Sequence, residues 1–415
     1  MAGPGAYSFG DEERKEVLDV LESGYLSRYG SLDDPKFKHK VYSLEQEFAN
    51  YLGSRHAIAN SSGTGSLFIS LLALGLQEGD EVLVPGYTFV ASIGSIIYSR
   101  ATPVLVEVDE SLTIDPTDLE SKITEKTKAI MPVHMLGNPC DMDAIMDIAK
   151  RHNFFVIEDG CQAAGGSFRG KRLGTFGDIG AFSLNQHKNI AAGSGGIIVT
   201  DDDTLYQRAF AISDQGHMPN RSGKEVGNRS LVGLNFQMNE LSGAVALAQV
   251  RKLEGMLQIL REKKRQLKSY IEEANISGLS FRRVNDIDGE CATMLTVIFD
   301  TKEMAKKVSE QLGTMPLSES GWHVYSNMEQ IVEHKTPTKN WSIQGKFTHA
   351  GDLPKTDDIL SRCVNVSVGV VDGGLGSAFG INIHSKDDDI KKVASRFIEV
   401  CESIQQETHY PSEKY

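Results

Sequence analysis

The stretch Ser183-Leu184-Asn185-Gln186-His187-Lys188, followed by Gly193-Ser194-Gly195-Gly196, places a lysine in a loop between two strand-like runs. An isolated lysine beside a glycine-rich turn is usually a solvated side chain. A lysine five residues after a serine also suits the anchoring of pyridoxal phosphate (PLP), through a Schiff base (internal aldimine) on Lys188. Two further groups distinguish these alternatives: an acid for the pyridine nitrogen and a cradle for the phosphate.

The acid follows the apolar run 154–157 of the chain, which ends in Glu158-Asp159. This pattern predicts a buried parallel strand with Asp159 at its carboxyl end, where α/β proteins place ligand groups. A carboxylate beside the pyridine nitrogen keeps that nitrogen protonated. Gln162, three residues on, is in position to reach the phenolic oxygen of the cofactor. The alternative is a polar strand end that caps the next segment.

The phosphate cradle is predicted from a strand, a turn rich in hydroxyl groups and a helix, at residues 56–60, 61–66 and 67–74. Backbone amides at the start of such a helix face an anion. A dinucleotide site fits poorly, because Phe68 stands where the third glycine of G-x-G-x-x-G should fall. The chain also lacks the G-x-x-x-x-G-K-[ST] motif of nucleotide-binding loops.

Six motifs together resemble the DegT/StrS family of fold type I sugar aminotransferases, over most of the chain. In chain order they occupy residues 60–64, 85–92, 132–137, 158–163, 183–196 and 233–240. The resemblance implies an α/β protein of fold type I, with a seven-stranded sheet in a large domain and a smaller α+β C-terminal domain. Seven apolar runs alternating with helical patterns between about residues 56 and 200 agree, because such alternation predicts a mostly parallel sheet with helices on both faces.

The resemblance also assigns the site. Its cofactor-binding residues are Ser62, Gly63, Thr64, Phe89, Asp159, Gln162, Ser183, Lys188 and Asn235. Lys188 is the catalytic residue, and Phe89 stacks on the cofactor ring. Asn235 reaches the phosphate of the neighbouring subunit, which implies a homodimer with shared active sites. Without the other motifs, Phe89 is read as a core residue and Asn235 as a turn residue.

One position departs from the family pattern. The usual Gly-Glu-Gly-Gly after the lysine is Gly-Ser-Gly-Gly here, with Ser194 in place of the glutamate. We expect the cofactor site to stay intact, while loop packing or substrate contacts change.

The substrate contacts implied by the resemblance lie in two segments. His217 and Arg229 precede the 233–240 motif and offer hydrogen bonds to sugar hydroxyls or a carboxylate. His323 and Tyr325 lie in a segment that loosely matches the small-domain stretch that closes over substrate in the family. Both histidines have an alternative role as surface or interface residues.

The resemblance implies a PLP-dependent aminotransferase that moves an amino group from glutamate, less often glutamine, to a keto-sugar. Family members that dehydrate keto-sugars carry histidine at the lysine position; here His187 is adjacent, but Lys188 occupies the position, which favours transamination. A PLP-dependent sugar dehydratase or lyase is the alternative, as is amination of another nucleotide-linked keto-sugar or a keto-cyclitol. Segments 214–217, 322–327 and 369–372 are similar to the subgroup that makes 8-amino-3,8-dideoxy-manno-octulosonate for lipopolysaccharide.

Composition excludes several other classes. The net charge of −13 argues against nonspecific binding to nucleic acid or an anionic membrane. The five cysteines are scattered, without C-x-x-C pairs or zinc-type histidine spacing, so we expect free thiols in the cytoplasm and no metal site. The N-terminus lacks an export pattern, and no uninterrupted apolar run reaches about 18 residues, so no membrane span is expected.

The chain is predicted to divide near residue 250. Residues 1–250 form an N-terminal arm and the large PLP-binding domain, and residues 251–415 form a linking helix and the small C-terminal domain. The linking helix is predicted from Met238 to about Ala274, and its charged stretch 261–265 is interpreted as a solvated face.

Overall fold

The computed structural model describes residues 2–31, 33–219, 229–337 and 349–409. Its centre is a seven-stranded sheet with the strand order β1-β9-β8-β5-β4-β2-β3. Neighbouring strands run parallel, except that β9 is antiparallel to both β1 and β8. Each of the seven apolar runs falls on a strand, so the predicted mostly parallel sheet is confirmed. The strands are β1 (His56–Asn60), β2 (Glu81–Pro85), β3 (Thr102–Val106), β4 (Thr127–Ile130), β5 (Phe155–Asp159), β8 (Ile179–Ser183) and β9 (Gly196–Thr200).

Helices cover both faces of this sheet, because successive strand side chains point to opposite sides. Leu83 of β2 belongs to a core shared with α3, α7 and α9, whereas its neighbours Val82 and Val84 belong to a core shared with α4, α5 and α8. The helices of the N-terminal part are α1 (Pro4–Tyr7), α2 (Asp11–Ser23), α3 (Lys40–Leu52), α4 (Gly63–Leu74), α5 (Val90–Tyr98), α6 (Pro116–Ser121), η1 (Met135–Gly137), α7 (Met142–His152) and α8 (Asp203–Ser213).

A smaller C-terminal part is built on a second, antiparallel sheet of order β10-β11-β12. Its strands are β10 (Leu279–Phe281), β11 (Met294–Phe299) and β12 (Cys363–Ser367), and a short hairpin, β6 (Ser167–Phe168) with β7 (Lys171–Arg172), lies earlier in the chain. The helices of the C-terminal part are α10 (Lys302–Gln311), η2 (Leu317–Glu319), η3 (Tyr325–Asn327), α11 (Glu329–Val332), α12 (Pro354–Ser361), η4 (Gly373–Leu375) and α13 (Asp387–His409).

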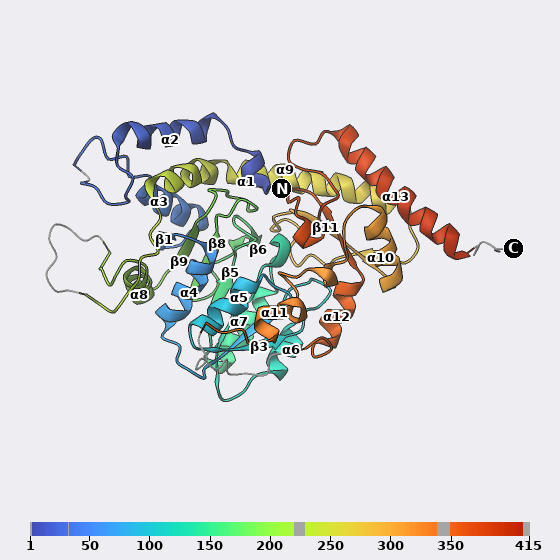
Figure 1. Cartoon of the computed structure of the whole chain (residues 1–415), viewed down its shortest axis with the longest axis horizontal. Coiled ribbons are helices and arrows are strands. Elements are labelled where there is room, and N and C mark those ends of the chain that lie inside the picture. Colours follow the sequence, from blue (N-terminus) through green and yellow to red (C-terminus); the bar gives the residue numbers. More distant parts are fainter. Residues whose placement is uncertain (1, 32, 220–228, 338–348, 410–415) are drawn as a thin grey trace.

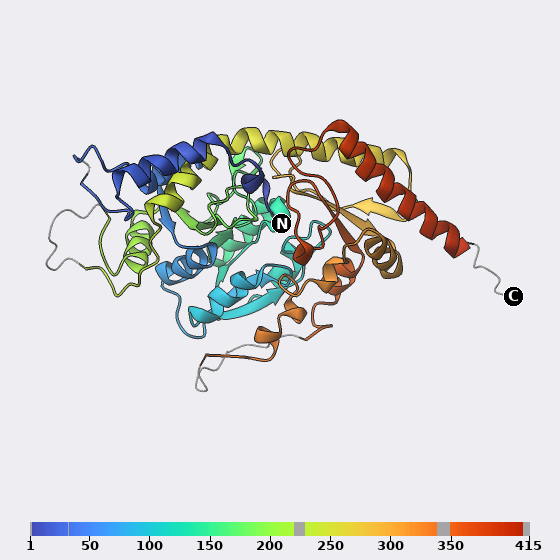
Figure 2. The same cartoon turned by 45° about the horizontal axis from the view of Figure 1, so that its top comes forward.

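The two parts are joined by the long helix α9 (Glu240–Glu273), whose first residue follows the capping side chain of Asn239. Figures 1 and 2 show α9 running along one edge of the molecule, with α2 and α3 beside its first half and α13 beside its second. The proposed division at residue 250 falls inside this helix. The charged stretch 261–265 is not simply a solvated face: the side chain of Lys264 is 8% exposed and pairs with Glu290. That interpretation was wrong at Lys264, because the helix buries this side of the stretch against the β10–β11 segment.

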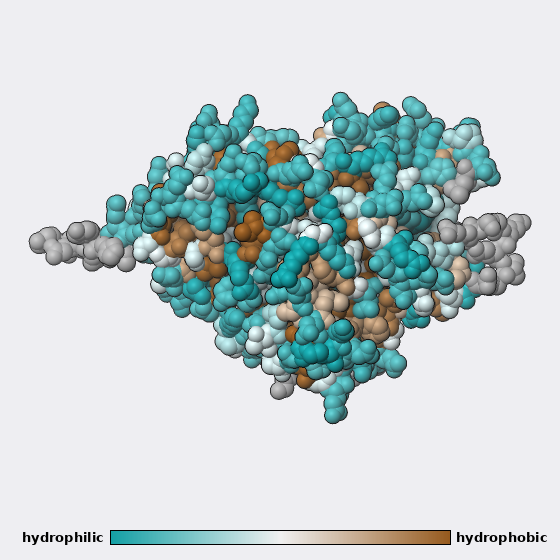
Figure 3. Space-filling view, turned by 180° about the vertical axis from the view of Figure 1, so that it is seen from behind, coloured by the Kyte–Doolittle hydropathy of each residue, from teal (hydrophilic) through white to brown (hydrophobic). Residues whose placement is uncertain are grey.

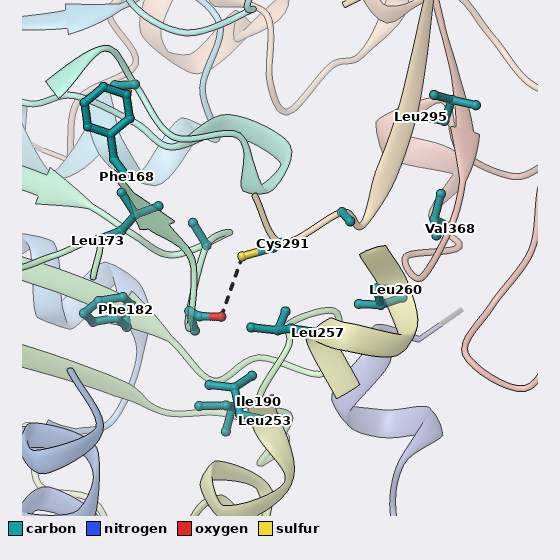
Figure 4. Close-up of a cluster of buried hydrophobic side chains, with 14 of the residues drawn as sticks. Phe168, Leu173, Phe182, Ile190, Leu253, Leu257, Leu260, Cys291, Leu295 and Val368 are labelled. Atoms are coloured by element: carbon teal, nitrogen blue, oxygen red, sulfur yellow. Dashed lines mark hydrogen bonds between the residues drawn. The ribbon is translucent and has the colours of Figure 1, made fainter. Parts of the chain in front are cut away.

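The main core lies where α9 meets the large sheet and the C-terminal part. In Figure 4, Leu257 of α9 lies on the side of Cys291, Leu253 lies beside Ile190, and Leu260 lies toward Val368. The Cys291 thiol donates to the carbonyl of Ala164 at 3.7 Å. All five cysteines are unpaired, and four are buried. Burying apolar surface contributes about 25 cal/mol of stability per Å², so the apolar side chains of α9 hold both parts of the molecule against one helix.

The outer surface is mixed. Figure 3 shows a largely hydrophilic face on which hydrophobic residues form separate patches. Among the residues that the structure describes, no helix has both the length and the apolar character needed to cross a membrane.

Candidate active site

A cavity of about 620 Å³ opens at the carboxyl edge of the large sheet, between its loops and segments of the C-terminal part. Eight of the nine residues predicted to bind the cofactor line it, together with the predicted substrate residue His323. These are Ser62, Gly63, Thr64, Phe89, Asp159, Gln162, Ser183, Lys188 and His323. Motifs far apart in the sequence therefore meet in one place, as the carboxyl ends of parallel strands do in α/β proteins.

Lys188 lies in the loop that follows β8 and is partly buried. Its backbone N–H donates to Asn185 O at 2.9 Å, which forms a tight turn after the strand. Burial lowers the pKa of the Lys188 amine, and the nearby Cys161, Asp159 and Asp372 oppose that effect. A lowered pKa increases the neutral fraction of the amine, which is the form that acts as nucleophile or base.

The N-terminal segment supports this loop from outside. Gly3 N–H donates to Gln186 O at 3.0 Å, and Gly5 N–H donates to Lys188 O at 3.2 Å. A Cβ on Gly3 would lie 2.2 Å from the carbonyl carbon of His187, so only glycine permits this approach. Gln249 of α9 fixes the segment by donating to Gly5 O at 2.9 Å. The first residues of the chain therefore set the position of the lysine backbone.

Asp159 ends β5 and is buried at the floor of the cavity. Its Oδ2 accepts a 2.7 Å hydrogen bond from Ser92 Oγ, and its Oδ1 accepts one of 3.1 Å from the N–H of Cys161. Ser92 in turn shares a 2.7 Å hydrogen bond with Thr88. These contacts fix the carboxylate in one orientation.

The neighbouring acid, Glu158, has a different role. It is fully buried and accepts hydrogen bonds from the backbone N–H groups of Gly174, Phe176 and Gly177, at 2.5 to 2.8 Å. Its Oε2 also lies 3.1 Å from Nε2 of the buried His134. Glu158 thus holds the loop before β8 and leaves Asp159 as the acid of this pair that lines the cavity.

The start of α4 and the end of β8 form the predicted phosphate cradle. Ser62 caps α4, and its Oγ accepts from the N–H of Gly65 at 3.0 Å. A Cβ on Gly63 would lie 2.5 Å from the Cβ of Ser183, so this close approach requires glycine. Ser194, which stands where the family pattern has glutamate, donates from its Oγ to the carbonyl of Ser61 at 3.0 Å. Its hydroxyl therefore ties the lysine loop to the turn before α4.

Gln162 has a fixed side-chain orientation. Its Oε1 accepts a 3.0 Å hydrogen bond from the backbone N–H of Leu136, which also lines the cavity. The amide NH₂ is then the remaining polar group, and it is a donor. A donor at this position agrees with the predicted contact to the phenolic oxygen of the cofactor, which stays a prediction.

Aromatic side chains form one wall. The Phe89 ring is 38% exposed and stacks with Trp322 at a centroid distance of 6.4 Å, and His323 lies 5.4 Å from Phe89. Ser320 Oγ donates to Gly374 O at 2.6 Å, so it accepts from Nδ1–H of His323, at 2.9 Å. His323 is therefore the Nδ1–H tautomer, and its Nε2 is an acceptor. Burial, and next the charge of Lys188, lower its pKa to about 3.

Four predicted residues lie outside the cavity of this single chain. Asn235 is exposed, and its Oδ1 accepts from the N–H of Gln237 at 3.1 Å. His217 lies on the same loop region, with Nδ1 2.8 Å from Asp214 O, and Arg229 is exposed nearby. Tyr325 is 1% exposed, and its hydroxyl donates to Asp357 at 3.0 Å. Tyr325 thus packs the segment that carries His323.

Sequence reasoning assigned no role to three residues that the structure places at the site. Ser92 was part of a quoted motif, yet its contact with Asp159 spans 67 residues. Asp372 lines the cavity and raises the pKa of Lys188, and Asn185 lines the turn before that lysine. The available signal for Ser92 was its position: it is a polar residue in the first turn of the helix that follows strand β2.

The residues present fit PLP. A partly buried lysine with a lowered pKa, a buried carboxylate fixed by Ser92, and a capped helix start brought against Ser183 by Gly63 match its aldehyde, ring nitrogen and phosphate. The fold and these groups define the class of PLP-dependent enzymes of fold type I.

The particular family follows from comparison. The model of the DegT/DnrJ/EryC1/StrS aminotransferase family matches residues 8–370, so the chain belongs to that family, and the predicted resemblance is confirmed. GDP-perosamine synthase of Caulobacter vibrioides is 41% identical over 243 residues, which cover 58% of this chain and 62% of that protein. GDP-perosamine synthase of Escherichia coli O157:H7 is 40% identical over 252 residues, covering 60% of this chain and 66% of that protein. Both matches span slightly less than two thirds of the relative.

The fold is also similar to solved structures. The crystal structure of 3-amino-5-hydroxybenzoic acid synthase superposes with a TM-score of 0.78 at 26% identity, covering 97% of this chain and 98% of that chain. The similarity extends over both parts of the molecule and confirms the fold type predicted from the sequence.

Proposed function

We propose that the protein is a PLP-dependent aminotransferase that moves an amino group from glutamate to a keto-sugar and so makes an amino sugar. The observation that carries this proposal is the meeting of Lys188, Asp159 and the α4 start in one cavity. The family match and the two GDP-perosamine synthases support it.

The residues have separable roles in this proposal. PLP, when bound, supplies an electron sink for the carbon that loses a proton. Asp159 pairs with the ring nitrogen, and Ser62, Gly63, Thr64 and Ser183 hold the phosphate. The Lys188 amine, which burial favours in its neutral form, would take the proton from the Cα of the donor and return it at the C4′ carbon of the cofactor.

The aromatic wall is proposed to close on the substrate. Phe89 would cover the ring of the cofactor, and Trp322 and His323, which lie beside Phe89, would line the same side. Because His323 stays neutral with a free Nε2 acceptor, it suits a hydrogen bond from a sugar hydroxyl rather than an ion pair with a carboxylate. Of the four predicted substrate contacts, His323 is the one that lines the cavity of its own chain, and we propose it as a substrate contact.

The acceptor is proposed at two levels. The general class is a keto-sugar. Within it, the subgroup similarity favours 8-keto-octulosonate, whereas the GDP-perosamine synthases at 40 and 41% identity favour a nucleotide-linked keto-sugar. Assays with both acceptors separate the two, since the free octulosonate lacks the nucleotide.

We infer a homodimer with shared active sites. Asn235 is exposed and lies next to two exposed apolar residues, Val232 at 95% and Leu234 at 60% exposure. Apolar side chains left in water favour association, because burial removes them from solvent. A neighbouring subunit covering this loop would bring Asn235 to the phosphate of its site, as the sequence predicts.

The test is an absorbance spectrum of the purified holoenzyme before and after glutamate is added, repeated on Lys188→Ala. The wild type is expected to show a visible band that glutamate bleaches, and the variant is expected to show neither. A lysine-independent spectrum would contradict the proposed anchor. A band that glutamate leaves unchanged, with a keto-sugar converted without amine, would favour the dehydratase or lyase instead.

A further inference from the structure

A second cavity, of about 380 Å³, lies outside the candidate active site, between α9 and the segment that runs from β10 to β11. One stripe of α9 forms a wall, because residues 261, 264, 265 and 268 are spaced by three or four positions and share a face. The opposite wall comes from residues 281–290 and from Leu295 and Thr296 of β11. This is the helix face that the charge run 261–265 had suggested was merely solvated.

The cavity is strongly basic in an acidic protein. Six cationic side chains line it, against the two carboxylates of Asp288 and Glu290. The cations are Arg261, Lys264, Arg265, Lys268, Arg282 and Arg283. Five of the six also form ion pairs with carboxylates: Arg261 with Glu254, Lys264 with Glu290, Arg265 with Glu262, Lys268 with Glu272, and Arg283 with Asp109. The lining is nevertheless locally cationic in a chain that carries −13. A concave surface lined by one sign of charge concentrates counter-ions of the opposite sign.

Arg282 is the least satisfied of these groups. It is 4% exposed, and its Nη1 donates to the carbonyl of Met135 at 3.2 Å. Its Nε and Nη2 are buried and have no hydrogen-bond partner among the residues that the structure describes. A buried guanidinium with two unmade hydrogen bonds is costly, because these donors have lost their hydrogen bonds to water without gaining others. An anion accepting from both nitrogens would remove that cost.

The other cations differ in how readily they are available. Lys264 is buried with Glu290 at 2.5 Å, so this pair holds the inner wall. Arg265 and Lys268 lie at the rim, 69% and 41% exposed. They pair with Glu262 and Glu272 of their own helix, and Lys268 Nζ also lies 5.1 Å from the centroid of the Phe281 ring. Such exposed ion pairs contribute little to stability, so both cations can exchange partners for a bound anion.

An apolar patch adjoins the charge. Val284, Leu295 and the Phe281 ring line the cavity, and Ile287 is 67% exposed beside them. We propose that this cavity is a second binding site, for a phosphorylated small molecule whose phosphate meets Arg282 and whose organic part lies on Phe281 and Ile287. A dianionic phosphate suits the excess charge better than a single carboxylate, and arginine pairs with it through two nitrogens.

The test is titration calorimetry of the PLP-loaded holoenzyme at low salt, in a buffer without phosphate. PLP then occupies the phosphate cradle of the active site. The probes are phenyl phosphate and inorganic phosphate. Phenyl phosphate is expected to bind, and more tightly than inorganic phosphate, because of the apolar wall. Arg265→Ala/Lys268→Ala is expected to weaken binding about tenfold or more, since it removes two rim charges.

The matched control is Lys306→Ala/Lys307→Ala, which removes the same charge from exposed positions of α10 that do not line the cavity. It should leave the affinity within about twofold of the wild type. Arg282→Met should abolish binding, and the rim variants keep the test valid if that buried change prevents folding. Absence of binding to the wild type, or equal weakening in the rim and control variants, would overturn the proposal. Inorganic phosphate binding as tightly as phenyl phosphate would overturn the assignment of an organic part.

Discussion

Ser92 Oγ donates a 2.7 Å hydrogen bond to Oδ2 of Asp159, and both side chains are buried. Ser92 lies in the first turn of α5, and Asp159 ends β5, so one hydrogen bond joins two crossover units of the sheet. A carboxylate that accepts hydrogen bonds on both oxygens keeps one orientation. We therefore expect the proposed pairing of Asp159 with the ring nitrogen of the cofactor to depend on Ser92.

We predict that Ser92→Ala weakens PLP binding and slows turnover. A hydrogen bond to a charged group contributes about 1.5 to 3 kcal/mol, so a loss of ten- to a hundredfold is expected. PLP affinity is measured by titrating the apoenzyme, and turnover with glutamate follows from the same preparation. Ser99→Ala is the matched control, because Ser99 is buried after the same helix but donates to Ile96 O. Equal losses in both variants would point to stability rather than to Asp159.

The approach of Gly63 to Ser183 gives a second prediction. A Cβ at position 63 would lie 2.5 Å from the Ser183 Cβ, so Gly63→Ala pushes the start of α4 away from the end of β8. Overpacking of this kind costs about 1 to 3 kcal/mol, and PLP affinity should fall about tenfold or more. Gly94→Ala on α5, where a Cβ meets nothing within 4 Å, should bind PLP as the wild type does. Wild-type affinity in Gly63→Ala would contradict the cradle.

Much of the fold was predictable because its signals are local. The seven apolar runs predicted seven strands; Asp159 ends one of them, and Lys188 lies in the loop after another. Turn glycines and the hydroxyls of the α4 cap are also contiguous in sequence. Such features need no knowledge of which segments meet, since the carboxyl ends of parallel strands share one edge.

The remainder depends on contacts between distant segments. The hydrogen bond from Gly3 to Gln186 joins residues 183 positions apart, and nothing in the sequence near Gly3 indicates it. Lys264 reads as a solvated lysine within a charge run, yet it is buried against Glu290. Helical periodicity places a residue on a face, but only the packing of α9 decides whether that face is covered.

Asn235 provides a prediction about subunit sharing. Lys188→Ala and Asn235→Ala are each expected to be nearly inactive alone. In a mixed dimer, one site combines an intact lysine with the partner's intact asparagine, so a heterodimer should recover about half of the wild-type activity. The measurement is turnover after the two variants are unfolded and refolded together, compared with each refolded alone. No recovery would mean that Asn235 serves its own chain.

His323 leads to a prediction about pH. Burial, and next the charge of Lys188, lower its pKa from 6.5 to about 3, while the unfolded chain keeps the ordinary value. Between these values the unfolded chain binds a proton that the folded chain does not. Stability therefore rises with pH through this window, and it is lost as the pH falls below 6.5, by about 1.4 kcal/mol per pH unit.

His323→Asn tests this account because asparagine retains a donor for Ser320 Oγ but does not titrate. Unfolding by urea at pH 7 and pH 5 should show a smaller loss of unfolding free energy in the variant, by about 2 kcal/mol. The variant is less stable at pH 7 if packing is lost, but that effect is common to both pH values and cancels in the difference. An unchanged pH dependence would mean that His323 has the same pKa in the folded protein as in the unfolded chain, which would contradict the lowered pKa.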